Sequence, residues 1–226
     1  GSHRERGVDA GIARVADGIA RVLAVADADA DADAEAGAVA DGESGLVVDA
    51  TMLVLENSAG SGFGLGTDVA ELAAIADAIA ARGVPRDRVG FCLDAAHAWG
   101  AGIDLSDPAA IDGFLDDFDR RIGLDRLVMV HLNDSKVERG SNLDRHEHLG
   151  AGRIGEAGLA HLLTHPRLAG ATYYLETPGM DEGYDAVNVA RAYDLAAGRP
   201  LATLPPEAMT VRGSRARTAP RATEPV

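Results

Sequence analysis

Four short apolar runs in this chain alternate with helical patterns, and each run ends on a carboxylate or an imidazole. The runs are TMLVLE (51–56), RVGFCLD (88–94), RLVMVH (126–131) and ATYYLE (171–176). Each has the length and the apolar content of a buried strand. Because strand–helix–strand crossovers are right-handed, this alternation predicts an α/β fold of parallel strands with helices outside the sheet.

Apolar residues at helical spacing, i, i+3 and i+4, lie between and around these runs. The helical segments are 8–25, 68–81, 108–122, 156–165 and 186–197. A complete (β/α)8 barrel has eight strands over roughly 250 residues. With four strand signals, the sequence predicts about half of such a barrel, with about four parallel strands and flanking helices, in one domain over residues 1–199.

Two segments are expected to lie outside the packed core. Residues 26–45 read ADADADADAEAGAVADGESG, a low-complexity acidic insert, and residues 200–226 are rich in Pro, Thr and Arg. Both are poor in large apolar side chains, so neither can bury enough surface to offset the loss of chain entropy. We therefore predict that both are disordered.

The residues that end the four runs form a first candidate group of metal ligands: Glu56, Asp94, His131 and Glu176. The carboxyl ends of parallel strands meet at one edge of a sheet, where the active sites of βα folds lie. Three carboxylates with one imidazole suit zinc, manganese or magnesium. The alternative is that these side chains only satisfy one another through hydrogen bonds.

His97, Asp144 and His146 form a second candidate group. His97 lies three residues after Asp94, and the sequence DRH places Asp144 and His146 two residues apart, so that both point the same way from an extended segment. Three ligands with an open coordination position are typical of hydrolytic zinc. The alternative is an ordinary loop network of ion pairs that includes Arg145.

Five motifs carry a resemblance to a known family. They are LENSAG (55–60), GFCLDAAH (90–97), HLNDSK (131–136), DRHEHLGAGRIG (144–155) and LET (175–177). Together they resemble endonuclease IV, a family of trinuclear zinc AP endonucleases of base excision repair, over about residues 1–195. The resemblance implies that the predicted half-barrel is the C-terminal half of a TIM barrel.

The resemblance also implies the roles of the two ligand groups. The first group would hold one zinc, with Glu56 bridging to a neighbouring zinc, and the second group would hold another. The family's third zinc takes two histidines from earlier strands, one of them from an HPGSH motif; GSH at residues 1–3 is either the end of that motif or a remnant of an expression tag. We therefore expect two complete zinc sites, with Glu56, Asp94 and Glu176 as catalytic residues.

Members of this family hydrolyse the phosphodiester 5′ to abasic sites in double-stranded DNA with zinc-activated water. The resemblance therefore implies a zinc-dependent phosphodiesterase, with Lys136, Arg145 and Arg153 close to the DNA phosphates. As half of a barrel, the chain is expected to be truncated and impaired on its own.

Two alternative functions stay open. One is a sugar isomerase or epimerase of the same barrel superfamily, which uses a site like the first group. The other is a catalytically inert fragment that only binds metal. The second group favours the nuclease.

The net charge of −15 argues at first sight against a polyanionic partner. Seven of the acids, however, lie in the acidic insert, and four belong to the two ligand groups, where bound zinc would offset their charge. Cys92 is the single cysteine, which excludes a disulfide framework within the chain and indicates a cytoplasmic setting.

No apolar run approaches the roughly 18 residues of a membrane helix, so no membrane partner is expected. We expect a monomer if the barrel is intact and association through open barrel edges if it is truncated. His148 is a candidate second contact to the ligands or to phosphate, and His161 and His165 are expected to be solvated at a helix end. Trp99 is expected to pack.

Overall fold

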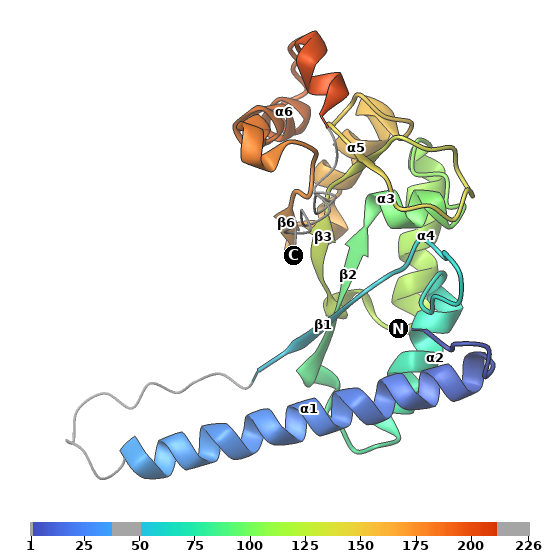
Figure 1. Ribbon diagram of the computed structural model, residues 1–226, viewed down its shortest axis with the longest axis vertical. Coiled ribbons are helices and arrows are strands. Elements are labelled where there is room, and N and C mark those ends of the chain that lie inside the picture. The colour runs from blue at the N-terminus through green and yellow to red at the C-terminus, as the bar shows by residue number, and fades with distance from the viewer. Residues whose placement is uncertain (1, 38–50, 212–226) are drawn as a thin grey trace, which may run out of the picture.

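A computed structural model of the chain describes residues 2–37 and 51–211. Its centre is a parallel sheet in the order β1–β2–β3–β6 (Figure 1). The strands are β1 (Leu53–Glu56), β2 (Val89–Asp94), β3 (Leu127–His131) and β6 (Thr172–Tyr174). All four apolar runs form strands, and the prediction of about four parallel strands with flanking helices is confirmed.

The part of the chain that the structure describes holds six α-helices and five short 3-10 helices. The α-helices are α1 (Val8–Gly37), α2 (Val69–Ala80), α3 (Ala95–Gly100), α4 (Pro108–Arg121), α5 (Gly155–Thr164) and α6 (Tyr184–Ala196). The 3-10 helices are η1 (Arg86–Arg88), η2 (Leu124–Arg126), η3 (Pro166–Leu168), η4 (Met180–Glu182) and η5 (Pro206–Thr210). A small antiparallel ladder pairs β4 (Asp134–Ser135) with β5 (His146–Glu147). None of the described helices is both long and apolar enough to cross a membrane.

The main core lies between the sheet and the helices that follow its strands. Phe91 of β2 packs edge-on against Phe118 of α4, with ring centroids 5.6 Å apart, and both rings are buried. Leu115 of α4 and Leu159 of α5 belong to the same cluster. Because successive strand residues point to opposite faces, this packing leaves Asp94 to face away from the helices.

Side-chain caps determine where two of these helices begin. Asp68 accepts the backbone N–H of Glu71 at 2.8 Å before α2, and Asp107 accepts the backbone N–H of Ala109 at 3.0 Å before α4. Helix α4 also has proline at its first position, where no N–H is needed. After α4 the chain turns at Gly123, whose φ of 98° favours glycine. The start and the stop predicted for this helix are therefore observed.

The prediction that residues 26–45 are disordered is wrong for the first part of this segment. Helix α1 continues through the Ala-Asp repeat to Gly37 and projects beyond the sheet (Figure 1). Alanine has the highest helix propensity, and a helix already anchored by its buried N-terminal half needs no new nucleus to continue. Asp27 also lies 2.7 Å from the guanidinium of Arg88. Residues 38–45 lie outside the described residues.

The prediction that residues 200–226 are disordered is wrong as far as the end of η5. Ala208 in η5 is 1% exposed. Arg191 of α6 donates to the backbone carbonyl of Ala202 at 2.6 Å. Leu201 also packs against the main core, and Val211 is buried. Hydrogen bonds to backbone carbonyls and apolar contacts together hold this segment against the fold. Residues 212–226 lie outside the described residues.

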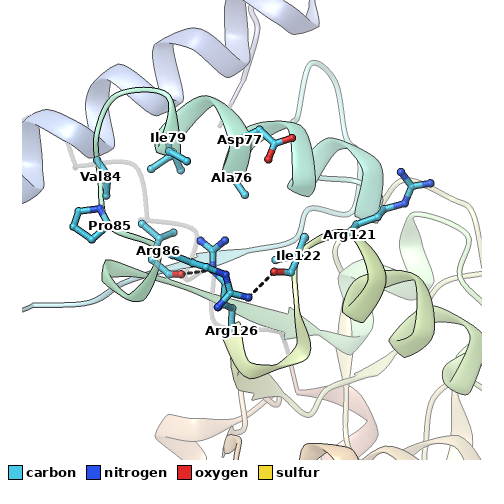
Figure 2. Close-up of a pocket in the computed structure, with 11 residues that line it drawn as sticks. Ala76, Asp77, Ile79, Val84, Pro85, Arg86, Arg121, Ile122 and Arg126 are labelled. Atoms are coloured by element: carbon cyan, nitrogen blue, oxygen red, sulfur yellow. Dashed lines mark hydrogen bonds between the residues drawn. The ribbon is translucent and has the colours of Figure 1, made fainter.

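A cavity of about 230 Å³ lies at the amino ends of β2 and β3 (Figure 2). Its lining includes Arg86, Arg121 and Arg126. Arg86 forms an ion pair with Asp125, and Arg126 donates to the backbone carbonyl of Val89 at 2.9 Å. This cavity lies at the edge opposite the one that carries function in βα folds.

Replacing Phe91 by alanine is expected to lower the free energy of unfolding by about 3–5 kcal/mol, because the lost ring leaves a cavity between β2 and α4. Phe63 is 44% exposed and provides a matched control. Phe63→Ala should cost less than about 1 kcal/mol. Urea unfolding followed by circular dichroism measures both changes, and equal losses would contradict this placement of the core.

Candidate metal centre

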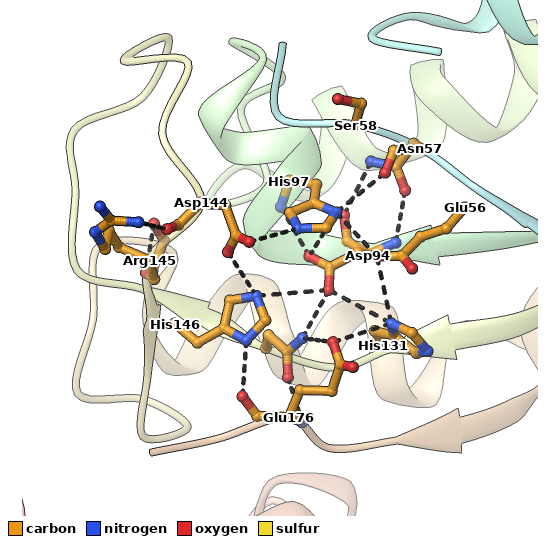
Figure 3. A network of polar contacts seen from close by, with 12 residues as sticks. Glu56, Asn57, Ser58, Asp94, His97, His131, Asp144, Arg145, His146 and Glu176 are labelled. Carbon is orange, nitrogen blue, oxygen red and sulfur yellow. Dashed lines mark hydrogen bonds and ion pairs between the residues drawn. The ribbon is translucent and has the colours of Figure 1, made fainter. Parts of the chain in front are cut away.

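The first candidate group converges at the carboxyl edge of the sheet (Figure 3). Glu56, Asp94 and His131 are the last residues of β1, β2 and β3, and Glu176 follows β6 by two residues. One ligand atom from each lies within 4.8 Å of the others. His131 Nδ1 lies 3.2 Å from Glu176 Oε2, 3.5 Å from Glu56 Oε1 and 3.6 Å from Asp94 Oδ2. The parallel order of the strands thus brings together the four residues selected from the sequence.

The second candidate group lies directly beside the first. Asp144 Oδ2 is 3.3 Å from His97 Nε2, and Asp144 Oδ1 is 3.0 Å from His146 Nε2. Asp94 joins this group as well, because ligand atoms of Asp94, His97 and His146 lie within 4.8 Å of one another. The sequence assigns Asp94 to the first group alone, whereas the structure places its carboxylate between the two.

Local structure explains how β2 supplies two members of this cluster. Asp94 is the N-cap of α3, and its Oδ1 accepts the backbone N–H of His97 at 2.8 Å. Capping fixes the first turn of α3, and that turn carries His97 back over the strand end. Asp94 therefore caps α3, and together with His97 it also forms a pair of candidate ligands.

The β4–β5 ladder places His146. It pairs Ser135 with His146 across the two short strands. The loop that follows is closed by Asp134, whose buried carboxylate accepts the backbone N–H groups of Gly152 and Ile154, both at 2.9 Å. Burial raises the pKa of Asp134 although these N–H groups oppose the shift.

Backbone carbonyls determine which nitrogen of two histidines faces the cluster. His97 Nδ1 lies 3.0 Å from the carbonyl oxygen of Asn57, and His146 Nδ1 lies 2.7 Å from that of Glu176. A carbonyl only accepts, so each Nδ1 carries hydrogen and each Nε2 faces a carboxylate. His97 Nδ1 also lies 2.9 Å from Glu56 Oε1. Histidines that bind metals are held in this way, with the second nitrogen donating to a carbonyl or carboxylate.

Two imidazole nitrogens of the cluster are buried and make no hydrogen bond to any described residue. They are His131 Nδ1 and His146 Nε2. Buried polar atoms without partners are costly, and both of these face carboxylates. Nitrogen and oxygen donors arranged in this way fit a divalent cation such as zinc. The residues present therefore fit the metal that the sequence resemblance implies.

The charges of the cluster are strongly coupled. Burial raises the pKa of Glu56, but the nearby imidazoles of His131 and His97 outweigh it and bring this pKa to about 2. Burial lowers the pKa of His97, but hydrogen bonds to Asp144 and Glu56 raise it to about 11. Asp94, with Cys92 and Glu56, raises the pKa of His131 to about 12.

The pKa of Asp144 is lowered, like that of Glu56, and the pKa of His146 is raised, like that of His97. The nearby imidazoles of His146 and His97 hold the pKa of Asp144 well below its usual range. For His146, burial lowers the pKa, and the nearby carboxylate of Asp144 outweighs burial and raises it. In the absence of a cation, protonated imidazoles thus neutralise the carboxylates.

Comparisons with known proteins place the chain in a family. Residues 1–198 match the family model described as "Xylose isomerase-like TIM barrel". The chain belongs to this family. It is 42% identical over 196 residues to "Probable endonuclease 4" of Methanoculleus marisnigri, covering 87% of this chain and 61% of that protein. It is 37% identical over 194 residues to "Probable endonuclease 4" of Halothermothrix orenii, covering 84% of this chain and 61% of that protein.

A solved structure gives the same result. The crystal structure of endonuclease IV from Thermus thermophilus superimposes with a TM-score of 0.54 and 38% sequence identity, covering 65% of this chain and 50% of that chain. The resemblance to the endonuclease IV family is therefore confirmed. The chain spans about 61% of the length of the two curated relatives above.

The three residues predicted to contact DNA lie in the loops that follow β3. Lys136 Nζ is 3.9 Å from Glu147, and Arg153 is 2.8 Å from Glu138. Arg145 donates to the backbone carbonyl of Asp144, beside the second group (Figure 3). All three stay predictions as DNA contacts.

Two aromatic residues near the motifs have structural roles. Trp99 is buried and donates from its indole to the carbonyl of Val137 at 2.9 Å, so the prediction that it packs is confirmed. His148 is fully buried, with Nδ1 2.8 Å from the amide of Asn188 and Nε2 3.0 Å from the carbonyl of Ala208. His148 therefore has the structural role, and the candidate contact with ligands or phosphate does not form, because both nitrogens are occupied within the fold.

His161 and His165 are not simply solvated, as predicted, but converge on Asp112 of α4. Their Nε2 atoms lie 2.8 Å and 3.2 Å from Asp112 Oδ1. His165 Nδ1 accepts the backbone N–H of Arg167, so the proton of its neutral ring is on Nε2 and points at Asp112. To bind a metal, Nε2 would need a free lone pair in place of this proton. The three side chains therefore form a hydrogen-bonded link between α4 and α5.

Binding of zinc to the cluster is expected to release protons from His97 and His131, because metal ligands must be neutral and both side chains have raised pKa values. Zinc affinity should therefore rise with pH up to about pH 11, as competition by protons weakens. Calorimetric titration at pH 7 in two buffers of different ionisation enthalpy measures the release.

His97→Gln is the matched variant, since it should release fewer protons than the parent chain. Identical binding heats in the two buffers would contradict the expectation.

Proposed function

We propose that this chain supplies the metal centre of an AP endonuclease of the endonuclease IV type, which hydrolyses the phosphodiester 5′ to abasic sites in DNA during base excision repair. The observation that carries the proposal is the joint cluster of two ligand groups at one sheet edge. The names of its relatives support the same activity.

Zinc is the metal that we propose for this centre. The two groups offer three imidazoles and four carboxylates, a donor set that suits zinc. Zinc bound there would lower the pKa of a water molecule and offset negative charge on the phosphate. The chain's own contribution is geometric: carbonyls orient His97 and His146, and the α3 cap orients Asp94. Glu56, Asp94 and Glu176 are the carboxylates that we propose to be catalytic.

The charge of the cluster supports a cation-dependent interaction with DNA. Without a cation, the carboxylates and the protonated imidazoles of the cluster largely offset one another, and bound cations would add the positive charge that attracts a phosphate. Lys136, Arg145 and Arg153 are proposed to contact phosphates around the centre. Double-stranded DNA with an abasic site is the proposed partner, and a reducing, cytoplasmic setting is consistent with the free Cys92.

A sugar isomerase or epimerase is the second candidate. The first ligand group alone would serve such an enzyme equally well. The contacts of Asp144 with His97 and His146 favour the nuclease, because they build a second group beside the first.

Cleavage of a duplex with one abasic site, followed on a denaturing gel, tests the proposal. The chain is assayed with zinc, alone and together with the part of a curated relative that it does not match. We expect stronger cleavage with that part than without it, because the chain spans about 61% of the relative's length. An aldose–ketose interconversion without DNA cleavage would favour the isomerase, and no reaction of either kind would favour an inert fragment.

In the reconstituted assay, His146→Gln is expected to reduce cleavage more than about 100-fold, since even residues that only support metal ligands cost 10–100-fold when replaced. His161→Gln is the matched control, because His161 lies on α5 and pairs with Asp112. Its activity should equal that of the unmodified chain. Equal activity of both variants would contradict the role of the second group.

A further inference from the structure

Two buried asparagines lie immediately behind the ligand cluster and belong to neither ligand group. Asn57 follows Glu56 at the end of β1, and Asn133 follows His131 by two residues at the end of β3. Asn57 is 6% exposed and Asn133 is fully buried. Figure 3 labels Asn57 within the polar network, beside Asp94 and His97.

Asn57 continues the ladder between β1 and β2 with its side chain. The last backbone pair of the ladder is Glu56 with Cys92. Beyond it, Asn57 Oδ1 accepts the backbone N–H of Asp94 at 2.7 Å, and Asn57 Nδ2 donates to the carbonyl of Asp94 at 3.1 Å. The amide thus replaces a further backbone pairing, and the main chain of β1 is free to leave the sheet.

Asn133 makes the corresponding link on the other side of the sheet. Its Oδ1 accepts the backbone N–H of Glu176 at 2.8 Å, and its Nδ2 donates to Asp94 Oδ2 at 2.7 Å. A single side chain therefore ties the end of β2 to the segment that follows β6. Aspartate could not replace it, because it has no donor for the carboxylate of Asp94.

These contacts fix both oxygens of one carboxylate. Asp94 Oδ1 accepts from His97 N–H, and Oδ2 accepts from Asn133. Each oxygen keeps a second lone pair. Oδ2 also lies 3.6 Å from His131 Nδ1 and 3.8 Å from His146 Nε2, the two nitrogens without hydrogen bonds.

We propose that Asn57 and Asn133 are positioning residues of the metal centre, which hold the ends of the four strands in register and orient the carboxylate of Asp94 toward its imidazole partners. This inference rests on the proposed function only in so far as the cluster binds zinc. Asn133 is the more important of the two, because it contacts the carboxylate itself, whereas Asn57 contacts only backbone atoms of Asp94.

Zinc affinity, measured by competition with a chelating dye, tests the proposal without any catalytic assay. Asn133→Leu keeps the volume of the side chain and removes its donor, so zinc affinity is expected to fall about 10–100-fold. Asn57→Leu should lower the affinity by a smaller factor. Cobalt in place of zinc should give a changed visible spectrum with Asn133→Leu, because the orientation of a ligand has changed.

Asn188 offers a matched control. It is also fully buried, and it binds His148 and the backbone N–H of Leu149, away from the cluster. Asn188→Leu should lower the melting temperature of the cation-free chain about as much as Asn133→Leu, yet leave zinc affinity within about threefold of the parent chain and the cobalt spectrum unchanged. If Asn133→Leu does not fold, Asn133→Ser replaces it, with a smaller expected loss of affinity.

Zinc affinity that is unchanged in the Asn133 variants, or reduced equally by Asn188→Leu, would overturn the proposal. Failure of the parent chain to bind zinc would overturn it as well. Zinc binding that depends on Asn133, in a chain that cleaves no abasic DNA even when reconstituted, would sink the proposed function and leave the positioning role standing.

Discussion

The carboxylate of Asp94 is the group on which the arrangement of the centre depends. It is fully buried at the end of β2, and a buried charge persists only when neighbouring groups satisfy it. Helix α3 supplies a backbone N–H, β3 leads to the amide of Asn133, and His131 and His146 approach from two sides. Four elements are therefore held in one relative placement by the need to satisfy a single side chain.

The strands and the positions of the candidate ligands could be predicted because both follow from local pattern. An apolar run that ends on an acid or a histidine identifies a strand and its terminal residue together, and parallel order then brings Glu56, His131 and Glu176 to one edge. The sharing of Asp94 between two groups could not be predicted. Spacing along the chain shows which strand a residue terminates. It does not show which neighbouring group the side chain of that residue contacts.

Contacts between distant segments account for the remaining differences. His148 is held by Ala208, 60 residues away, and Asp112 by two histidines about 50 residues away, and neither pairing leaves a local pattern in the sequence. Asn57 and Asn133 do leave a local pattern in the sequence, since each follows a candidate ligand within two residues. Helix α1 shows the opposite case, in which alanine propensity outweighed a composition typical of disorder.

Within the described residues, β1 and β6 are the outer strands of the sheet and each pairs on one side. Every strand of a parallel sheet delivers its last side chain to the same edge. A strand added beside β6 would bring its terminal residue next to Glu176, and one added beside β1 would bring its own next to Glu56. A wider sheet would therefore add candidate ligands to the first group, whereas the second group depends on α3 and on the segment around β5.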